Sequence, residues 1–214
     1  MVEKALNNYI LYDFVRVTAA PGLLLLRPRC VYASKEAKGH IRGGAIVIAN
    51  HSGFADPVYL MAAIWYRRHH FICMKAFFDK PFNRWLFTQF HCIPIDRENF
   101  SMDSFGRIVD ELKSGHLVSM FPEGHVNTEA KLAPFKSGMV LMALRSAKPV
   151  IPVYIMPRRH WYSRLTVGIG QPLDVAAELG GKPTMAGIER LSRLLEERER
   201  ELSTLINQRY GGRQ

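Results

Sequence analysis

Short apolar runs separated by longer amphipathic stretches alternate along most of the chain. An apolar run of this length predicts a strand that is buried on both faces. The candidate strands are GGAIVIAN (43–50), HFICMK (70–75), CIPI (92–95), HLVSMF (116–121), PVIPVYIM (149–156) and SRLTVGIG (163–170). Helical patterns separate most of them, so we expect an α/β fold: a single domain with a mainly parallel central sheet flanked by helices.

The intervening segments have helical spacing. Helices are expected at 80–90, from Ser101 to a stop at Gly115, and at 135–147. The last helix, 188–210, is highly charged, and its expected inner stripe is Ile188, Leu191, Leu195, Leu202 and Leu205. Its arginines alternate with glutamates, which indicates a solvated face and argues against a nucleic-acid partner.

Residues 1–29 are expected to form a helical segment that contacts a membrane, ahead of the main domain at 30–214. The segment does not resemble a signal peptide, and Asp13, Arg16 and the Pro21-Gly22 pair interrupt any apolar span. Packing of this helix on the domain is the alternative interpretation.

Composition adds a charge preference. The chain has 214 residues, with 29 Lys and Arg against 19 Asp and Glu, which gives a net charge of +10. Such a charge favours an anionic partner: a nucleic acid, an anionic membrane or a phosphate-bearing substrate. Cys30, Cys73 and Cys92 lack C-x-x-C spacing, so a disulfide framework is not expected and a reducing cytosolic location is favoured.

Polar residues follow three of the predicted strands. His51 and Asp56 follow the first, Asp96-Arg97 follows CIPI, and Glu123-Gly124-His125 follows the strand at 116–121. In open α/β sheets, functional sites form outside the carboxyl ends of the strands. We therefore expect these groups to converge on one pocket.

His51 and Asp56 suit general-base catalysis. A neutral imidazole can accept a proton from an attacking hydroxyl, and a carboxylate on its other nitrogen orients the ring. A loop that returns to a helix start at Asp56-Pro57 can bring the two side chains together. The alternative is a helix-capping aspartate beside a packed histidine.

The remaining polar residues suit substrate binding. Arg97 and Lys136 are suited to phosphate, and Glu123, in a turn framed by Pro122 and Gly124, can accept bonds from substrate hydroxyls. Surface ion pairs and a turn residue that caps the next segment are the alternatives.

Together these blocks resemble the glycerolipid acyltransferase family, which includes the 1-acylglycerol-3-phosphate acyltransferases. The H-x-x-x-x-D motif is His51 to Asp56, the arginine block is similar to IPIDR (93–97), F-P-E-G is Phe121 to Gly124, and the apolar fourth block is similar to VIPVYI (150–155). The resemblance covers about residues 45–156.

The resemblance implies fatty acyl transfer from a thioester, on coenzyme A or acyl carrier protein, to a lysophospholipid hydroxyl, most simply that of 1-acylglycerol-3-phosphate. His51 would be the general base, Asp56 would orient it, and Glu123 with Gly124 would shape the acceptor site. Arg97 and Lys136 would hold phosphate, and no cofactor or metal is implied. The third block reads FPEGHVN where the family commonly has F-P-E-G-T-R-S, which leaves a different lyso-lipid acceptor, for example a lyso-aminolipid, open.

Aromatic residues mixed with Lys and Arg at 74–87 and 156–164 predict contact with an anionic membrane, so we expect a peripheral protein at the cytoplasmic face. The main alternative is a basic domain that binds anionic membrane or nucleic acid without chemistry. A metal hydrolase ranks last, because no H-E-x-x-H is present and His69 and His70 are adjacent.

Overall fold

The computed structural model describes residues 9–96, 101–124, 126, 135, 137–160 and 162–211. Its elements are, in chain order, α1 (Ile10–Leu25), β1 (Arg29–Tyr32), η1 (Glu36–Lys38), β2 (Ala45–Ala49), α2 (Asp56–Ala63), β3 (His69–Met74), η2 (Lys75–Phe78), α3 (Pro81–Gln89), β4 (Ile93–Ile95), α4 (Met102–Lys113), β5 (Leu117–Met120), α5 (Gly138–Ser146), β6 (Val150–Ile155), β7 (Thr166–Ile169), α6 (Val175–Leu179) and α7 (Met185–Tyr210).

Seven strands form one sheet in the order β1-β7-β6-β2-β5-β3-β4. β2 pairs in parallel with β5 and β6, and β3 pairs in parallel with β5 and β4. β7 runs antiparallel to β6, and β1 runs parallel to β7. The predicted mainly parallel α/β sheet is confirmed, and the carboxyl ends of β2, β5 and β3 lie at one edge.

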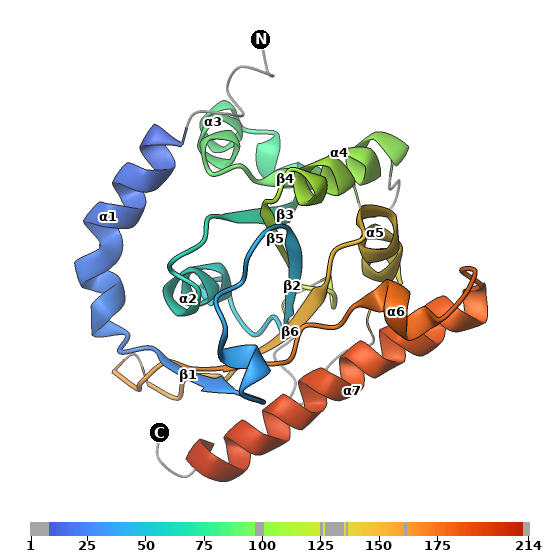
Figure 1. Ribbon diagram of the computed structural model, residues 1–214. Helices are drawn as coiled ribbons and strands as arrows, with labels where there is room; N and C mark the ends of the chain where they lie inside the picture. Colours follow the sequence, from blue (N-terminus) through green and yellow to red (C-terminus); the bar gives the residue numbers. More distant parts are fainter. Residues whose placement is uncertain are drawn as a thin grey trace.

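The central strand β2 separates two cores, because alternate side chains of a strand point to opposite faces. Ile46 and Ile48 pack into the cluster formed with α4, α5 and α7. Ala45, Val47 and Ala49 belong to the cluster formed with α2 and the end of α1. Helices therefore cover both faces of the sheet (Figure 1). Because both faces of β2 are buried, its sequence is a continuous apolar run.

The N-terminal segment contains both a helix and the start of a strand. α1 packs on the domain through Tyr12, which is 1% exposed and whose hydroxyl accepts a hydrogen bond from the His69 backbone N–H at 2.9 Å. The strand β1 begins at Arg29 and was not predicted, because its four residues, RCVY, are too short and polar to give a clear pattern.

The long helix α7 shows a different inner stripe from the predicted one. Ile188, Leu191, Leu195 and Leu202 are buried as expected, but Leu205 is 40% exposed and its neighbour Ile206 is fully buried. Ile206 packs against β7 at Gly168, where an added Cβ would collide with the Ile206 Cδ1. The prediction for Leu205 was wrong because the helical repeat places position 206 over the sheet.

This register can be tested with two matched truncations in α7. Leu195→Ala should lower the free energy of unfolding by about 2–5 kcal/mol, because Leu195 is fully buried and leaves a cavity. Leu205→Ala should change it by less than about 1 kcal/mol. Urea unfolding measures both, and equal losses would show that the assigned register of α7 is incorrect.

Candidate active site

The loop that leaves β2 is fixed to the neighbouring strand by Asn50. This side chain is 4% exposed, its Nδ2 donates to the Ile155 carbonyl at 3.0 Å, and the Ile155 N–H donates to its Oδ1 at 2.7 Å. Asn50 thereby extends the pairing of β2 with β6 by one residue. Sequence reasoning placed it inside the apolar run and did not identify this role.

His51 and Asp56 form a hydrogen-bonded pair. His51 Nδ1 lies 2.9 Å from Asp56 Oδ2, and the Asp56 side chain is almost fully buried. The same oxygen accepts the backbone N–H groups of Ser52 at 2.6 Å and Gly53 at 2.8 Å. Because two backbone N–H groups donate to this oxygen, it also acts as the acceptor toward Nδ1. The pattern therefore assigns the proton to Nδ1 and leaves the lone pair on Nε2.

The helix start differs slightly from the prediction. α2 begins at Asp56 itself, with Pro57 next, and Ala55 is the residue at the N-cap position. The Asp56 side chain turns back to the preceding loop and closes it around His51. The predicted loop-borne geometry is present, although Asp56 does not act as the helix cap.

Glu123 and Gly124 lie beside this loop, in the turn that follows β5. Glu123 is 5% exposed, and its Oε1 accepts the His51 backbone N–H at 3.1 Å. Gly124 has φ of +78° and donates its N–H to the Phe121 carbonyl at 3.0 Å, a left-handed turn that favours glycine. The structure thus brings together four predicted residues: His51, Asp56, Glu123 and Gly124.

The imidazole of His51 is also positioned by an aromatic side chain. Phe121 stacks on it with ring centroids 4.2 Å apart and an interplanar angle of 17°. Phe121 belongs to the F-P-E-G block, so this block supports the histidine through both a backbone hydrogen bond and a ring contact.

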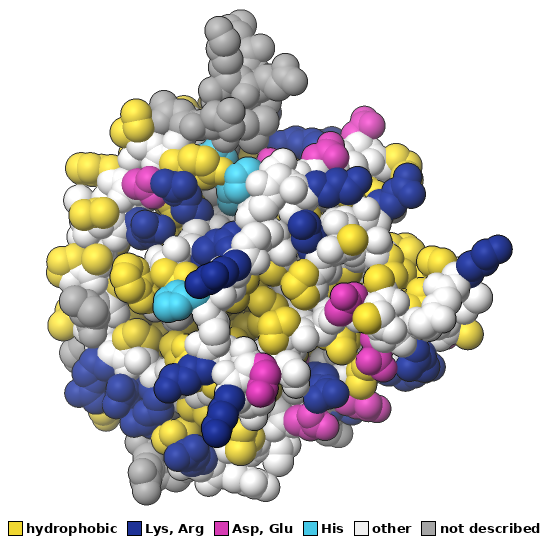
Figure 2. Space-filling view, viewed as in Figure 1, with side chains coloured by type: hydrophobic (Ala, Val, Ile, Leu, Met, Phe, Trp, Pro, Cys, Tyr) yellow, Lys and Arg dark blue, Asp and Glu magenta, His cyan; other side chains and the backbone are white. Residues whose placement is uncertain are grey.

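His51 opens onto a large apolar cavity of about 1240 Å³. Its walls come from β3 and η2, the end of β5, the start of α5, and α7; the lining includes His51, Phe54, Phe71, Met74, Phe77, Phe87, Gly124, Met139 and Met142. Figure 2 shows hydrophobic side chains around a hollow in the middle of this face, with Lys and Arg beside it. The site can hold a long apolar chain next to a proton acceptor.

Two predicted phosphate ligands, Arg97 and Lys136, lie outside the described residues. The cavity has another guanidinium that sequence reasoning assigned to a solvated face, that of Arg193 on α7. Arg193 lies 3.9 Å from Glu189 in a well-exposed pair, so it remains accessible to a ligand. The charged pattern of α7 gave no signal that would separate this arginine from its neighbours.

Glu199 of α7 is completely buried and lies near Asn50 and Glu123. Burial raises its pKa well above the ordinary value of 4.5, the charge of Glu123 raises the pKa further, and the nearby Asn50 backbone acts in the opposite direction. Burial therefore favours the protonated form of Glu199, and Glu123 is the carboxylate that accepts the His51 N–H. Its position on the apolar stripe of α7 is the one sequence signal for its burial.

Comparison with known proteins identifies the family. The acyltransferase family model matches residues 29–156, more than half of the chain, and the chain belongs to this family. The match includes β2, the His51 loop and the turn at Glu123.

Individual relatives are more distant. The chain is 27% identical to the Brassica napus 1-acyl-sn-glycerol-3-phosphate acyltransferase BAT2, chloroplastic, over 52% of this chain and 32% of that protein. It is 28% identical to the 1-acyl-sn-glycerol-3-phosphate acyltransferase of Streptococcus pneumoniae, over 61% of this chain and 50% of that protein. The chain thus spans about a third to a half of the length of these curated relatives.

A solved structure has the same fold. The 1-acyl-sn-glycerophosphate (LPA) acyltransferase PlsC from Thermotoga maritima superposes with a TM-score of 0.62 at 19% identity, covering 90% of this chain and 78% of that one.

The raised pKa of the buried Glu199 predicts a pH effect on stability. The unfolded chain loses this proton near pH 4.5, whereas the folded chain keeps it to a much higher pH. Glu199 thus makes stability fall as the pH rises above about 4.5. Glu199→Gln should therefore reduce the fall in the free energy of unfolding between about pH 5 and about pH 8, as measured by urea unfolding. The exposed Glu201→Gln should keep the parent's slope, and an unchanged slope in Glu199→Gln would contradict the assignment.

Proposed function

We propose that the protein transfers a fatty acyl group from an acyl thioester to the hydroxyl of a lysophospholipid. The observation that carries this proposal is the His51–Asp56 pair at the wall of the apolar cavity. A proton acceptor with a fixed tautomer supplies the general base, and the cavity supplies a place for the fatty chain.

The proposed mechanism uses His51 Nε2 as the proton acceptor. The acceptor hydroxyl gives its proton to Nε2 as its oxygen attacks the thioester carbonyl, and a C–O bond forms. The tetrahedral intermediate then collapses, the C–S bond breaks, and the sulfur leaves with the proton from the imidazolium. Asp56 stabilises the positive ring throughout, and no acyl-enzyme is formed.

The size and lining of the cavity support an acyl substrate. Its volume of about 1240 Å³ exceeds the roughly 300–1,000 Å³ of ordinary small-molecule pockets. The aromatic and methionine side chains of its walls favour a flexible hydrocarbon chain by burying it from water. The donor on this proposal is acyl-CoA or acyl carrier protein.

For the acceptor we propose 1-acylglycerol-3-phosphate, which would give phosphatidic acid. The Brassica napus and Streptococcus pneumoniae relatives are 1-acyl-sn-glycerol-3-phosphate acyltransferases, which supports this choice. Arg97 and Lys136 are proposed to hold the phosphate, and Arg193 is a described guanidinium at the same cavity. The departure at FPEGHVN keeps another lyso-lipid, such as a lyso-aminolipid, as the alternative acceptor.

We also propose that the protein binds peripherally to an anionic membrane at the cytoplasmic face. Within the part of the chain that the structure describes, no helix has the length and apolarity to cross a bilayer. α1 instead exposes Ile10, Phe14 and Val17, which are 75%, 62% and 68% exposed and share one side of the helix. α3 exposes Phe82 and Trp85 at 66% and 51%. Exposed apolar groups on a protein of charge +10 suit an anionic interface.

The catalytic proposal is tested by the rate of acyl transfer in a His51→Gln variant. Loss of the general base should lower the rate by at least roughly 10²-fold, because Gln cannot take the proton. Acyl-CoA and acyl carrier protein thioesters are each incubated with a panel of lysolipids, and both thiol release and lipid product are followed. Preference for 1-acylglycerol-3-phosphate over lyso-aminolipids would support the proposed acceptor.

The exposed His40→Gln serves as the matched control and should keep the parent's rate. A His51→Gln variant as active as the parent on any productive acceptor would exclude the mechanism. Absence of transfer with every donor and acceptor would instead favour a basic membrane-binding domain without chemistry.

Membrane contact is tested with the paired change Phe82→Ala and Trp85→Ala. The parent should sediment with anionic vesicles at low salt, and the double variant should bind several-fold more weakly, because two exposed aromatic groups are removed from α3. Leu205→Ala removes an exposed apolar group from the charged helix α7 and should bind like the parent. If the parent protein does not sediment with anionic vesicles at low salt, this proposal is excluded.

A further inference from the structure

A second group of polar side chains lies at the opposite edge of the sheet from His51. His70 lies near the start of β3, His116 immediately precedes β5, and Glu111 lies near the end of α4. Because β3 and β5 are parallel neighbours, their starting ends lie side by side. The two imidazoles therefore stack, with ring centroids 4.5 Å apart and an interplanar angle of 27°.

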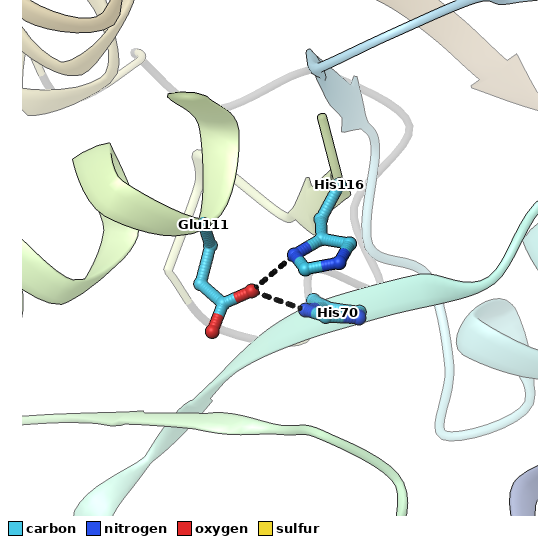
Figure 3. A group of neighbouring side chains, drawn as sticks. All are labelled: His70, Glu111 and His116. Atoms are coloured by element: carbon cyan, nitrogen blue, oxygen red, sulfur yellow. Dashed lines mark hydrogen bonds and ion pairs between the residues drawn. The ribbon is translucent and has the colours of Figure 1, made fainter. Parts of the chain in front are cut away.

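The two histidines share a partner on each side. On one side, Glu111 Oε2 lies 3.0 Å from His70 Nδ1 and 2.6 Å from His116 Nδ1, as Figure 3 shows. On the other side, the Tyr9 hydroxyl lies 3.1 Å from His70 Nε2 and 3.4 Å from His116 Nε2. Both Nδ1 atoms point toward the same carboxylate oxygen, and both Nε2 atoms point toward the same hydroxyl.

When both histidines are neutral, this cluster has too few hydrogens to make all of its contacts hydrogen bonds. Each neutral imidazole carries one N–H, and the tyrosine carries one O–H. Three hydrogens are thus available for four contacts, so one contact in the neutral cluster lacks its hydrogen.

A divalent cation removes this shortage. With a cation on the Glu111 side, both Nδ1 atoms become unprotonated ligands, and both Nε2–H groups donate to the two lone pairs of the Tyr9 oxygen. Histidines that bind metals usually donate their other N–H in this way, which fixes the tautomer. We propose that His70, Glu111 and His116 bind a divalent transition-metal ion such as Zn²⁺, with Tyr9 orienting the two imidazoles.

The distances suit zinc. The three ligand atoms lie within 4.8 Å of one another. Ligands about 2.0–2.1 Å from a tetrahedral zinc ion lie roughly 3.3 Å apart. Glu111 Oε2, now 3.0 and 2.6 Å from the two Nδ1 atoms, would therefore move outward to admit the ion. His116 and Glu111 are 35% and 21% exposed, which leaves a route from solvent and room for water as the fourth ligand.

The charges around the cluster are compatible with a cation. Glu111 supplies a carboxylate oxygen, a ligand type that zinc accepts beside imidazole nitrogens. Two guanidinium groups near the cluster already have partners: Arg67 donates to the Gly115 carbonyl at 2.8 Å, and Arg68 lies over the Tyr9 ring at 4.4 Å and is paired with Asp13 at 2.6 Å. The positive charge of Arg68 is thereby directed to Asp13 and away from the ligand side.

The proposed ion has a structural role, because His51 and this cluster lie at opposite ends of the strands. Tyr9 immediately precedes α1, while the three ligands come from β3, α4 and the start of β5. A bound cation would therefore link the start of α1 to three elements of the domain. The appropriate measurements are binding and stability rather than the rate of acyl transfer.

The test uses the full chain, stripped of metal with a chelator and titrated with Zn²⁺ in equilibrium dialysis. We expect one Zn²⁺ per chain and a higher melting temperature with the metal than without it. Glu111→Gln and His116→Gln should each weaken binding by at least about tenfold, and Tyr9→Phe should weaken it by roughly tenfold through loss of ring orientation. His160→Gln, which changes an exposed histidine outside the cluster, should bind like the parent.

The proposal is overturned if the parent binds no Zn²⁺ at micromolar free metal. It is also overturned if Glu111→Gln and His116→Gln, with circular dichroism spectra like the parent's, keep its affinity. If either variant fails to fold, nuclear magnetic resonance of the parent decides: Zn²⁺ must shift the ring signals of both His70 and His116, and unshifted signals reject the site.

Discussion

The hydrogen bond from the His51 backbone N–H to the Glu123 carboxylate joins the ends of β2 and β5. It depends on the parallel pairing of these strands, in which Ile48 is opposite Met120, so that both chains leave the sheet at the same level. Asn50 makes the equivalent link to β6 with two hydrogen bonds. The His51 loop is thus held from both neighbouring strands, and a shift in either register would move the imidazole away from the cavity.

This constraint explains why so few polar residues define the site. Asp56 Oδ2 closes the loop by accepting two backbone N–H groups as well as His51 Nδ1, so one carboxylate shapes the backbone and fixes the tautomer. Glu199 on α7 is also fully buried, and this burial raises its pKa well above the ordinary value. The charge of Glu123 raises the pKa of Glu199 further, because two ionised carboxylates would repel one another.

The sequence predicted those features that depend on local pattern. Apolar runs gave the strands on which His51 and Glu123 stand, and the spacing of the motifs gave the residues that meet there. The prediction from sequence failed for features that depend on the three-dimensional arrangement of the chain. Leu205 and Ile206 are adjacent apolar residues, and only packing on Gly168 selects Ile206. His70 and His116 are far apart along the chain and meet only because the strand order places β3 beside β5, so no ligand spacing was visible.

The short helix α3 connects the cavity to the molecular surface. Phe87 lines the cavity and packs against Phe77 and Phe78, while Phe82 and Trp85 on the same helix are exposed. No residue of α3 is fully buried, so the domain alone covers only part of its apolar surface. On the proposed function, the remaining part would be buried by an acyl chain within the cavity and by the acyl region of a bilayer outside. A lipid-using enzyme at a membrane supplies both, which gives the proposed substrate and the proposed membrane contact one structural cause.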